Sequence, residues 1–180
     1  MIHETNRLIL RPWTEDDAEE LYRYAKDPKV GPAAGWPAHT SIEESREIIR
    51  TVFSADEMYA VVPKSAGTPV GSIGFLMGNN SNFSPLTDDE CELGYWIGVP
   101  YWGQGLIPEA ATILLNYAFN QLGMNKVWCA HFEGNNQSKR VQEKCGFKYQ
   151  YTRENAEVSL LGEKKTEIVS CLTRDEWDKR

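Results

Sequence analysis

The chain has 180 residues, of which 41% are hydrophobic and 25% are charged, and its formal net charge is −7 at pH 7. This length and composition predict one compact globular domain over residues 1–180. The negative charge argues against a nucleic-acid surface, which is normally basic, and it is compatible with a cationic acceptor such as an amine.

No segment suggests export, membrane insertion or a structural metal. The N-terminus lacks a basic segment followed by an apolar run, and no apolar stretch is long enough to span a bilayer. The four cysteines are scattered without a CxxC pair, so neither a zinc site nor a disulfide framework is indicated. We therefore expect a cytoplasmic protein with reduced thiols, no bound metal and no membrane partner.

The first third of the chain is typical of a strand followed by two helices. Residues 6–13 form the expected strand, and Thr14 can cap the helix that follows. The segment 27–40 is rich in Pro and Gly and predicts a shaped loop. Ser41 and Glu44 form a capping box, which predicts the start of a second helix. The residues expected to point inward from this helix are Ile48, Ile49, Val52 and Phe53.

The remainder alternates strands with two helices. The expected strands are Met58–Pro63, 69–77, 90–99, Lys126–Phe132, 147–153 and 166–173, with a turn around Gly162 in the last pair. One expected helix is 108–122, with Pro108 in its first turn, and the other is 135–144, which Gly146 closes. This order predicts a mixed α/β single domain around one sheet.

The segment with most chemical content joins the strand 90–99 to the helix 108–122 through a glycine-rich turn. Gly103 and Gly105 leave room for a ligand to approach the main chain, and the free amides of the helix N-terminus point the same way. These features predict a pyrophosphate cradle, with an ordinary tight turn as the alternative. The spacing matches neither a Walker motif nor a Rossmann fingerprint, since no Gly-Lys-Ser/Thr follows and Pro108 replaces the third glycine.

Residues 102–107 (Trp-Gly-Gln-Gly-Leu-Ile) resemble the CoA-pyrophosphate turn of the GNAT acetyltransferase superfamily, and more specifically its RimJ/RimL-type branch, which acetylates the N-termini of ribosomal proteins. Further matches follow in order along the chain: 7–13, 36–37 with 39–40, 94–97, 101–105 with 109–110, and Asn135 and Ser138 with 143–147. Two positions depart from the pattern. Trp102 replaces the usual Arg or Gln, and Ile107 replaces the final Gly or Ala.

The resemblance implies a GNAT fold, with a central, mostly antiparallel seven-stranded sheet flanked by about four helices and splayed at an acetyl-CoA cleft. It also implies an N-acetyltransferase that moves the acetyl group of acetyl-CoA to a primary amine by direct attack. Acetyl-CoA is then a cosubstrate, and no metal is needed. The implied cofactor contacts are Ile97, Val99, Trp102, Gly103, Gln104, Gly105, Leu106, Ile107, Asn135 and Ser138.

Direct attack needs a base for the amine proton and a donor for the leaving thiolate. The resemblance makes Glu92 the candidate base, acting itself or through an ordered water, with an exposed strand glutamate in a surface pair as the alternative. Many superfamily members carry a tyrosine acid where this chain has Gln142. Ser138 remains as the candidate acid, with helix capping as its alternative role.

The acceptor is expected between the loop 27–40 and the polar stretch 78–89. Its candidate contacts are Trp36, His39, Tyr95 and Trp96. The acceptor could be a protein N-terminal amine or a small amine such as a polyamine, an amino sugar or antibiotic, or an amino acid. A non-catalytic acyl-CoA sensor is the rival hypothesis, since the helix tyrosine is missing. A nucleotide-phosphate enzyme is a third, which lacks the required lysine and metal carboxylates. The last two strands could pair across a homodimer.

Overall fold

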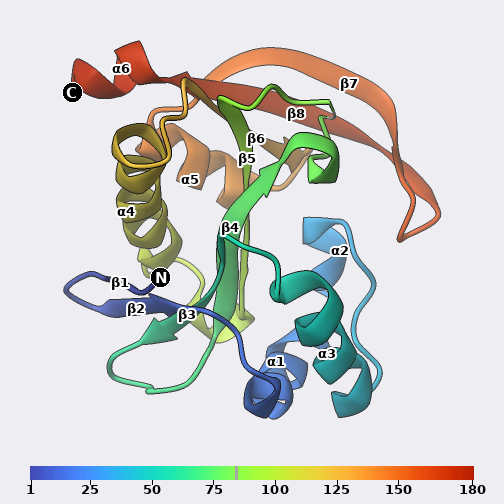
Figure 1. Cartoon of the computed structure of the whole chain (residues 1–180). Helices are drawn as coiled ribbons and strands as arrows, with labels where there is room; N and C mark the ends of the chain where they lie inside the picture. Colours follow the sequence, from blue (N-terminus) through green and yellow to red (C-terminus); the bar gives the residue numbers. More distant parts are fainter. Residues whose placement is uncertain (84) are drawn as a thin grey trace.

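A computed structural model describes residues 1–83 and 85–180 as one twisted sheet with helices on both faces (Figure 1). The strands follow the order β1-β2-β3-β4-β5-β6-β8-β7, and every neighbouring pair is antiparallel except β5 and β6. The strands are β1 (His3–Glu4), β2 (Leu8–Arg11), β3 (Met58–Pro63), β4 (Gly71–Met77), β5 (Glu90–Ile97), β6 (Lys126–Phe132), β7 (Lys148–Val158) and β8 (Glu163–Thr173).

Helices connect these strands. In the described ranges the α-helices are α1 (Ala18–Ala25), α2 (Gly31–Ala34), α3 (Ile42–Ile48), α4 (Leu106–Asn120), α5 (Asn136–Cys145) and α6 (Arg174–Asp178). Shorter 3₁₀ turns occur at Glu15–Asp17, Gly78–Asn80 and Val99–Tyr101, and a π-helical turn occurs at Ile49–Phe53.

The predicted mixed α/β domain with a mostly antiparallel sheet is confirmed. Its described part has eight strands rather than seven, because the two-residue β1 pairs with β2 at the start of the chain. It also has six α-helices rather than about four, because the short helix α2 lies within the predicted loop 27–40 and the short helix α6 begins at a capping box formed by Thr173 and Glu176. The four cysteines are buried free thiols.

Two apolar cores lie on opposite faces of the sheet. On one face, Leu114 and Ala118 of α4 pack with Leu93 of β5 in the larger core. On the other face, Leu21 of α1 and Trp96 of β5 belong to a second core. Figure 1 shows this division, with α4 and α5 on one side of the central strands and α1, α2 and α3 on the other. The central strands are therefore covered on both faces.

The strands β5 and β6 pair over only three positions. Glu90, Cys91 and Glu92 face Lys126, Val127 and Trp128, respectively. Beyond Glu92, β5 continues beside β4 as far as Ile97, whereas β6 continues beside β8 as far as Phe132. The two strands therefore diverge, and the gap between them opens immediately after Glu92.

Local signals explain the helix starts. Ser41 Oγ accepts a hydrogen bond from the Glu44 N–H at 3.0 Å, as the capping box predicts. The helix α4 begins at Leu106, two residues earlier than expected, so Pro108 occupies its third position, where a missing N–H leaves no intrahelical bond unmade. The prediction for Val52 is wrong, since it is 46% exposed. The π-helical turn after α3 changes the residue spacing and rotates this side chain out of the core.

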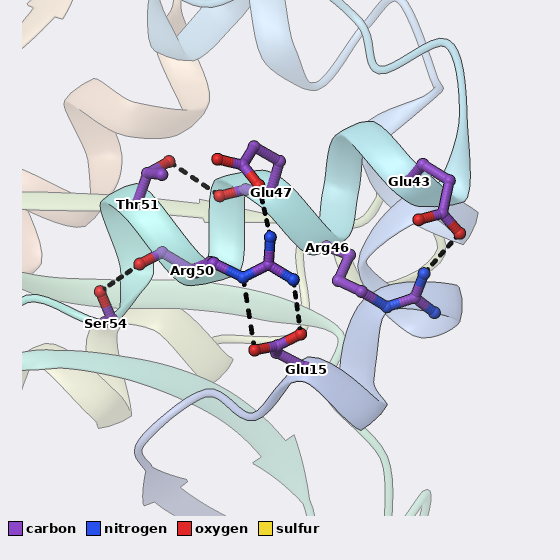
Figure 2. A network of polar contacts seen from close by, with 7 residues as sticks. All are labelled: Glu15, Glu43, Arg46, Glu47, Arg50, Thr51 and Ser54. Atoms are coloured by element: carbon purple, nitrogen blue, oxygen red, sulfur yellow. Dashed lines mark hydrogen bonds and ion pairs between the residues drawn. The ribbon is translucent and has the colours of Figure 1, made fainter.

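A surface network ties the end of α3 to the turn before α1 (Figure 2). Arg50 pairs with Glu15 at 2.9 Å and with Glu47 at 2.8 Å, and Arg46 pairs with Glu43. Because Arg50, Glu15 and Glu47 are more than half exposed, water screens these pairs and their contribution to stability is small. No helix among the described residues has the length and apolarity needed to cross a membrane.

Candidate active site

The turn between β5 and α4 presents a row of unpaired main-chain donors. Within residues 1–83 and 85–180, the N–H groups of residues 103–107 donate no hydrogen bond. Gly103 and Gly105 have φ values of 74° and 73°, which favour glycine. A Cβ added at Gly103 would meet no heavy atom within 4 Å. The N-terminus of α4 adds partial positive charge, so the turn fits a diphosphate group.

The side chains of this turn brace it from behind. The Trp102 indole N–H donates to the carbonyl of Ile97 at 2.9 Å, and Gln104 Nε2 donates to the carbonyl of Pro100 at 2.9 Å. Leu106 and Ile107 are buried in the core beneath α4. The side chain of Ile107, which replaces the usual Gly or Ala, therefore packs inward, and its main-chain N–H stays at the start of the helix. Trp102, which replaces the usual Arg or Gln, binds the turn to the end of β5 through its indole N–H.

The free edge of β5 faces the gap. The Gly98 N–H donates to the carbonyl of Val70 beside β4 at 2.8 Å. Main-chain groups alternate along a strand, so the N–H and carbonyl of Ile97 point away from β4 and toward the gap. The Val99 N–H donates to no acceptor in the described part of the chain. Both predicted main-chain contacts are thus available to a ligand.

Glu92 lies at the last β5–β6 pair and is only 6% exposed. Its Oε2 accepts bonds from Ser81 Oγ and the Asn82 N–H, both at 2.7 Å, and its Oε1 accepts one from Asn82 Nδ2 at 2.8 Å. Burial raises the pKa of Glu92, and these three donors oppose the rise because they stabilise the charged form. A carboxylate offers about four lone-pair sites, so roughly one remains free on Oε1.

The loop that holds Glu92 is anchored by the C-terminal hairpin. Arg153 of β7 donates to the carbonyl of Asn82 at 3.1 Å and lies 5.0 Å from the ring centre of Phe83. Arg153 also pairs with Glu167 of β8. The position of the candidate base therefore depends on contacts between three distant parts of the chain. Ser84, within the expected acceptor wall 78–89, lies outside the described residues.

The N-terminus of α5 reaches the gap from the other side. Asn135 caps the helix, since its Oδ1 accepts from the Ser138 N–H at 3.1 Å, and its Nδ2 donates to the carbonyl of Ala33 at 3.3 Å. Ser138 Oγ lies 2.8 Å from the Tyr95 hydroxyl. The side chain of Tyr95 thus crosses from β5 to α5, which brings two predicted site residues together.

The four candidate acceptor contacts divide between the two faces of β5. Tyr95 packs against the core beneath α4, whereas Trp96 belongs to the core beneath α1. Trp36 lies edge-on to Trp96, with 5.7 Å between ring centres. His39 is buried against α3, where its Nδ1 lies 2.8 Å from Ser45 Oγ, and burial lowers the pKa of His39. Alternation places Gly94 on the Trp96 face, and a Cβ added there would meet nothing within 4 Å.

Sequence reasoning missed the residues that position the site. The polar run around Ser81 and Asn82 was predicted as a linker and as a wall of the acceptor site, but not as the segment that holds Glu92, although turn-forming residues there are typical of a loop that folds onto a strand. Arg153 and Arg7 carry no local signal, because their partners Asn82 and Glu109 are far away in the sequence. In the described residues, no group of His, Cys, Asp and Glu side chains is arranged to hold a metal ion.

Comparisons with known proteins agree with this geometry. A sequence profile described as "Acetyltransferase (GNAT) domain" matches residues 7–148. The chain is 27% identical over 128 residues to the uncharacterized N-acetyltransferase p20 of Bacillus licheniformis, covering 68% of each protein. A GNAT-family acetyltransferase structure from Bacillus anthracis superposes with a TM-score of 0.84 at 21% identity, covering 98% of this chain and 100% of the other.

A structure from Vibrio cholerae, described as a candidate ribosomal-protein-serine acetyltransferase, is 28% identical with a TM-score of 0.77, covering 96% of this chain and 97% of the other. This likeness is consistent with the RimJ/RimL-type branch. The family profile spans most of the chain, including the glycine turn and the strands β5 and β6. The chain belongs to the GNAT acetyltransferase family and is an acyltransferase.

Proposed function

We propose that the protein is an N-acetyltransferase that transfers the acetyl group of acetyl-CoA to a primary amine by direct attack. The observation that supports this most is the arrangement along β5. Glu92 lies where the gap to β6 opens, and the N–H groups of residues 103–107, which have no acceptor in the described residues, follow the other end of the same strand. A base and a diphosphate cradle therefore lie at the two ends of one gap.

Glu92 is the proposed base. An amine attacks only when it is neutral, so its proton must leave before or during attack. The free lone pair on Glu92 Oε1 can take this proton directly or through a water. Burial raises the pKa of Glu92 and makes it a stronger base than an exposed glutamate. The exposed surface pair considered as an alternative does not fit a carboxylate that is 6% exposed.

The remaining steps need donors for two developing charges. The Ile97 N–H points toward the gap, and the Val99 N–H has no acceptor in the described part of the chain; both are proposed to bind the pantetheine arm or the oxyanion. Asn135 and Ser138, at the start of α5, are proposed to contact the pantetheine arm and the sulfur. The turn 103–107 is proposed to bind the diphosphate of acetyl-CoA, because its donors are free in the described residues and its glycines leave room.

A protein N-terminal amine is the proposed acceptor, with a small amine as the alternative. Support comes from the 28% identical Vibrio cholerae structure and from the motif resemblance over most of the chain. The chemistry is also easier, because an α-amine titrates near ~8 whereas a lysine amine titrates near ~10, so a single carboxylate base suffices. The open space above Gly94, on the Trp96 face of β5, is the proposed place of the acceptor.

A homodimer through the C-terminal hairpin is a separate proposal. The strand β7 lies at the edge of the sheet and exposes Tyr149 and Tyr151 at 62% and 41%. An unpaired edge strand can pair with a second copy. Light scattering of the protein tests this, with a dimer mass expected and a monomer mass at all concentrations as the contrary result.

Incubation with acetyl-CoA and a pool of acceptors, followed by mass spectrometry, tests the function. The pool contains peptides with free N-termini, polyamines, amino sugars and amino acids. Glu92→Gln is expected to reduce turnover about 10²- to 10⁴-fold with little effect on CoA binding. Glu90→Gln, on the same strand but paired with Lys126 at the surface, serves as the control and should retain activity. CoA binding without any acetylated product would instead favour the acyl-CoA sensor.

A further inference from the structure

Four polar side chains form a hydrogen-bonded chain across the gap between β5 and β6. The Tyr95 hydroxyl lies 2.8 Å from Ser138 Oγ, and Gln142 Nε2 lies 3.4 Å from the same oxygen. Gln142 Oε1 lies 3.0 Å from His131 Nδ1. Gln142 and His131 are buried, with exposed fractions of 2% and 8%. These hydrogen bonds connect β5 and β6, the strands on the two sides of the gap, through the helix α5.

The hydrogens that each group carries limit the directions of these bonds. The Tyr95 hydroxyl has a single hydrogen and lies near two oxygens of Ser138, the carbonyl oxygen at 3.2 Å and Oγ at 2.8 Å. Its shorter contact is to Ser138 Oγ. Gln142 Nε2 can only donate. When Tyr95 donates along its shorter contact, Ser138 Oγ accepts two hydrogen bonds, and its own hydrogen has no partner within residues 1–83 and 85–180.

This arrangement gives a structural role to Gln142. It replaces the tyrosine that many superfamily members carry, and it is buried rather than presented to the gap. His131 Nδ1–H donates to Gln142 Oε1, which turns the Nε2 of Gln142 toward Ser138. A side chain with one donor end and one acceptor end, fixed at both, orients the hydroxyl between it and Tyr95.

We propose that Tyr95 and Gln142 are positioning residues that make Ser138 a hydrogen-bond donor to the CoA thiolate as the acetyl group leaves. This inference rests on the proposed function. In the transfer step the amine nitrogen bonds to the carbonyl carbon and its proton goes to Glu92. The carbon–sulfur bond breaks, and its electron pair goes to sulfur. The Ser138 hydroxyl stabilises the resulting thiolate without giving up its proton.

Tyr95 itself is not the proton source. Burial raises the pKa of Tyr95 well above its ordinary value, so the phenol stays neutral and remains a donor. The titratable group that faces it is the Cys129 thiol of β6, and His131 of β6 is joined to it through Gln142; neither is a fixed cation that would favour a phenolate. A permanent donor to Ser138 is the role that this environment supports.

The pKa of the CoA thiol bound to the protein tests the inference, because a donor to the thiolate lowers it. Thiolate absorbance is titrated for CoA alone and for CoA bound to the wild type, Ser138→Ala and Tyr95→Phe. We expect the bound thiol pKa to rise by about one unit in each variant, the effect of losing one bond to a charged group. We also expect kcat to fall about tenfold with less than twofold change in CoA affinity. Tyr149→Phe is the matched control, because the Tyr149 hydroxyl bonds to Thr152 alone among the described residues.

Combined variants sharpen the result. If Tyr95 acts through Ser138, the double variant Tyr95→Phe/Ser138→Ala should match Ser138→Ala alone. The inference would be overturned if the effects of the two substitutions on the thiol pKa were additive, or if Tyr95→Phe kept the thiol pKa of the wild type. Acetylation by the wild type would still support the proposed function in that case. Failure of CoA to bind at all would overturn both. If Tyr95→Phe does not fold, Gln142→Met removes the second donor, and an unchanged thiol pKa there would equally overturn the inference.

Discussion

Arg7 and Glu109 form an ion pair across 102 positions of the sequence, with 2.6 Å between Arg7 Nη2 and Glu109 Oε2. Arg7 directly precedes β2, and Glu109 lies in the first turn of α4. The same guanidinium donates through Nη1 to the carbonyl of Gln104 at 3.0 Å. Because a peptide unit is planar and trans, holding this carbonyl fixes the Gly105 N–H on the opposite side. The first strand thereby helps to orient the phosphate turn.

Replacing Arg7 should weaken CoA binding more than it weakens the fold. In Arg7→Met the Gln104–Gly105 peptide is free to rotate, and one oriented donor to the diphosphate is lost. We expect the Kd for CoA to rise about 3- to 10-fold by calorimetry, which corresponds to roughly 0.5–1.5 kcal/mol, the net value of one ordinary hydrogen bond. The pair is 51% and 23% exposed, so the free energy of unfolding should change by less than about 1 kcal/mol.

The control for this prediction is Arg23→Met. Arg23 pairs with Glu20 at 3.1 Å along α1, and neither residue has a side-chain hydrogen bond or ion pair to the turn 103–107 among the described residues. Its removal should leave CoA affinity unchanged. Equal affinity in Arg7→Met and in the wild type would show that the turn keeps its shape without this clamp.

Acetylation should depend on pH through Glu92. The carboxylate is the active form, so kcat/KM should rise with pH through the pKa of Glu92, which burial raises. Asn82→Ala removes the Nδ2 donor at 2.8 Å, which stabilises the charged form, so the acidic limb should move to higher pH. Asn80→Ala, at an exposed site in the same loop, should leave the profile in place. An acidic limb that did not move in Asn82→Ala would contradict Glu92 as the base.

Stability should respond to the same group with the opposite trend. The folded pKa of Glu92 is raised above the unfolded value, so the folded state binds its proton more tightly than the unfolded state. The resulting stabilisation is fully present below the unfolded pKa near ~4.5 and is lost as pH rises through the folded pKa. In Asn82→Ala this loss should extend to higher pH. Urea unfolding at a series of pH values, with Asn80→Ala beside it, measures the difference.

The parts of the fold that sequence reasoning predicted depend on neighbouring residues. The bounds of β3 and β6 match the prediction, because their apolar runs end at turn-forming residues. Gly146 ends α5 with a φ of 83°, a conformation that glycine adopts without strain. The glycine turn was also predictable, since two positive-φ positions and a helix start lie within a few residues of one another.

The parts that could not be predicted depend on distant contacts. Nothing near Arg153 indicates that it holds the loop at Asn82, 71 positions away. His39 resembled a pocket residue, but its ring lies against Ser45, which only the packing of α3 decides. Tyr95 and Trp96 are a different case. Alternation along a strand already places neighbouring residues on opposite faces, so assigning both to one pocket disregarded the strand period.

Gly94 should control access of the acceptor. A Cβ there would meet no heavy atom within 4 Å, so Gly94→Leu should fold normally yet fill the space between Glu92 and Trp96. We expect an unchanged Kd for CoA and a KM for the acceptor that rises at least about tenfold, since overlap with a well-packed ligand is costly. An unaltered acceptor KM would place the acceptor elsewhere. Steady-state kinetics and calorimetry separate the two effects.

The partner of Gly94 on β4 is Gly74, which provides the contrasting variant. A Cβ at Gly74 would lie 2.3 Å from the carbonyl oxygen of Glu57, so Gly74→Ala must displace the backbone. This change should lower the free energy of unfolding by about 1–3 kcal/mol. Although the two glycines are paired across the same two strands, substitution of Gly94 should therefore change activity, whereas substitution of Gly74 should change stability.

Glu57 holds a strained conformation at the start of β3. Its φ is 64°, which favours glycine, and its carboxylate accepts bonds from the Tyr59 hydroxyl at 2.6 Å and the Tyr117 hydroxyl at 3.1 Å. Glu57→Gly and Glu57→Ala both lose these bonds, but only glycine relieves the backbone. A left-handed residue costs about 1–2 kcal/mol, partly offset by the greater unfolded-state entropy of glycine. The free energy of unfolding of Glu57→Gly should therefore exceed that of Glu57→Ala by about 1 kcal/mol, which corresponds to a Tm higher by roughly 2–4 °C.

Comparison with the wild type then separates strain from bonding at Glu57. If the two tyrosine bonds outweigh the strain, both variants are less stable than the wild type, and Glu57→Ala is the less stable of the two. If the strain dominates, Glu57→Gly is more stable than the wild type, while Glu57→Ala is still less stable. An alanine variant as stable as the glycine variant would mean that the chain relaxes out of the left-handed region once the carboxylate is gone. The bonds to Tyr59 and Tyr117 would then be the cause of this conformation rather than its consequence.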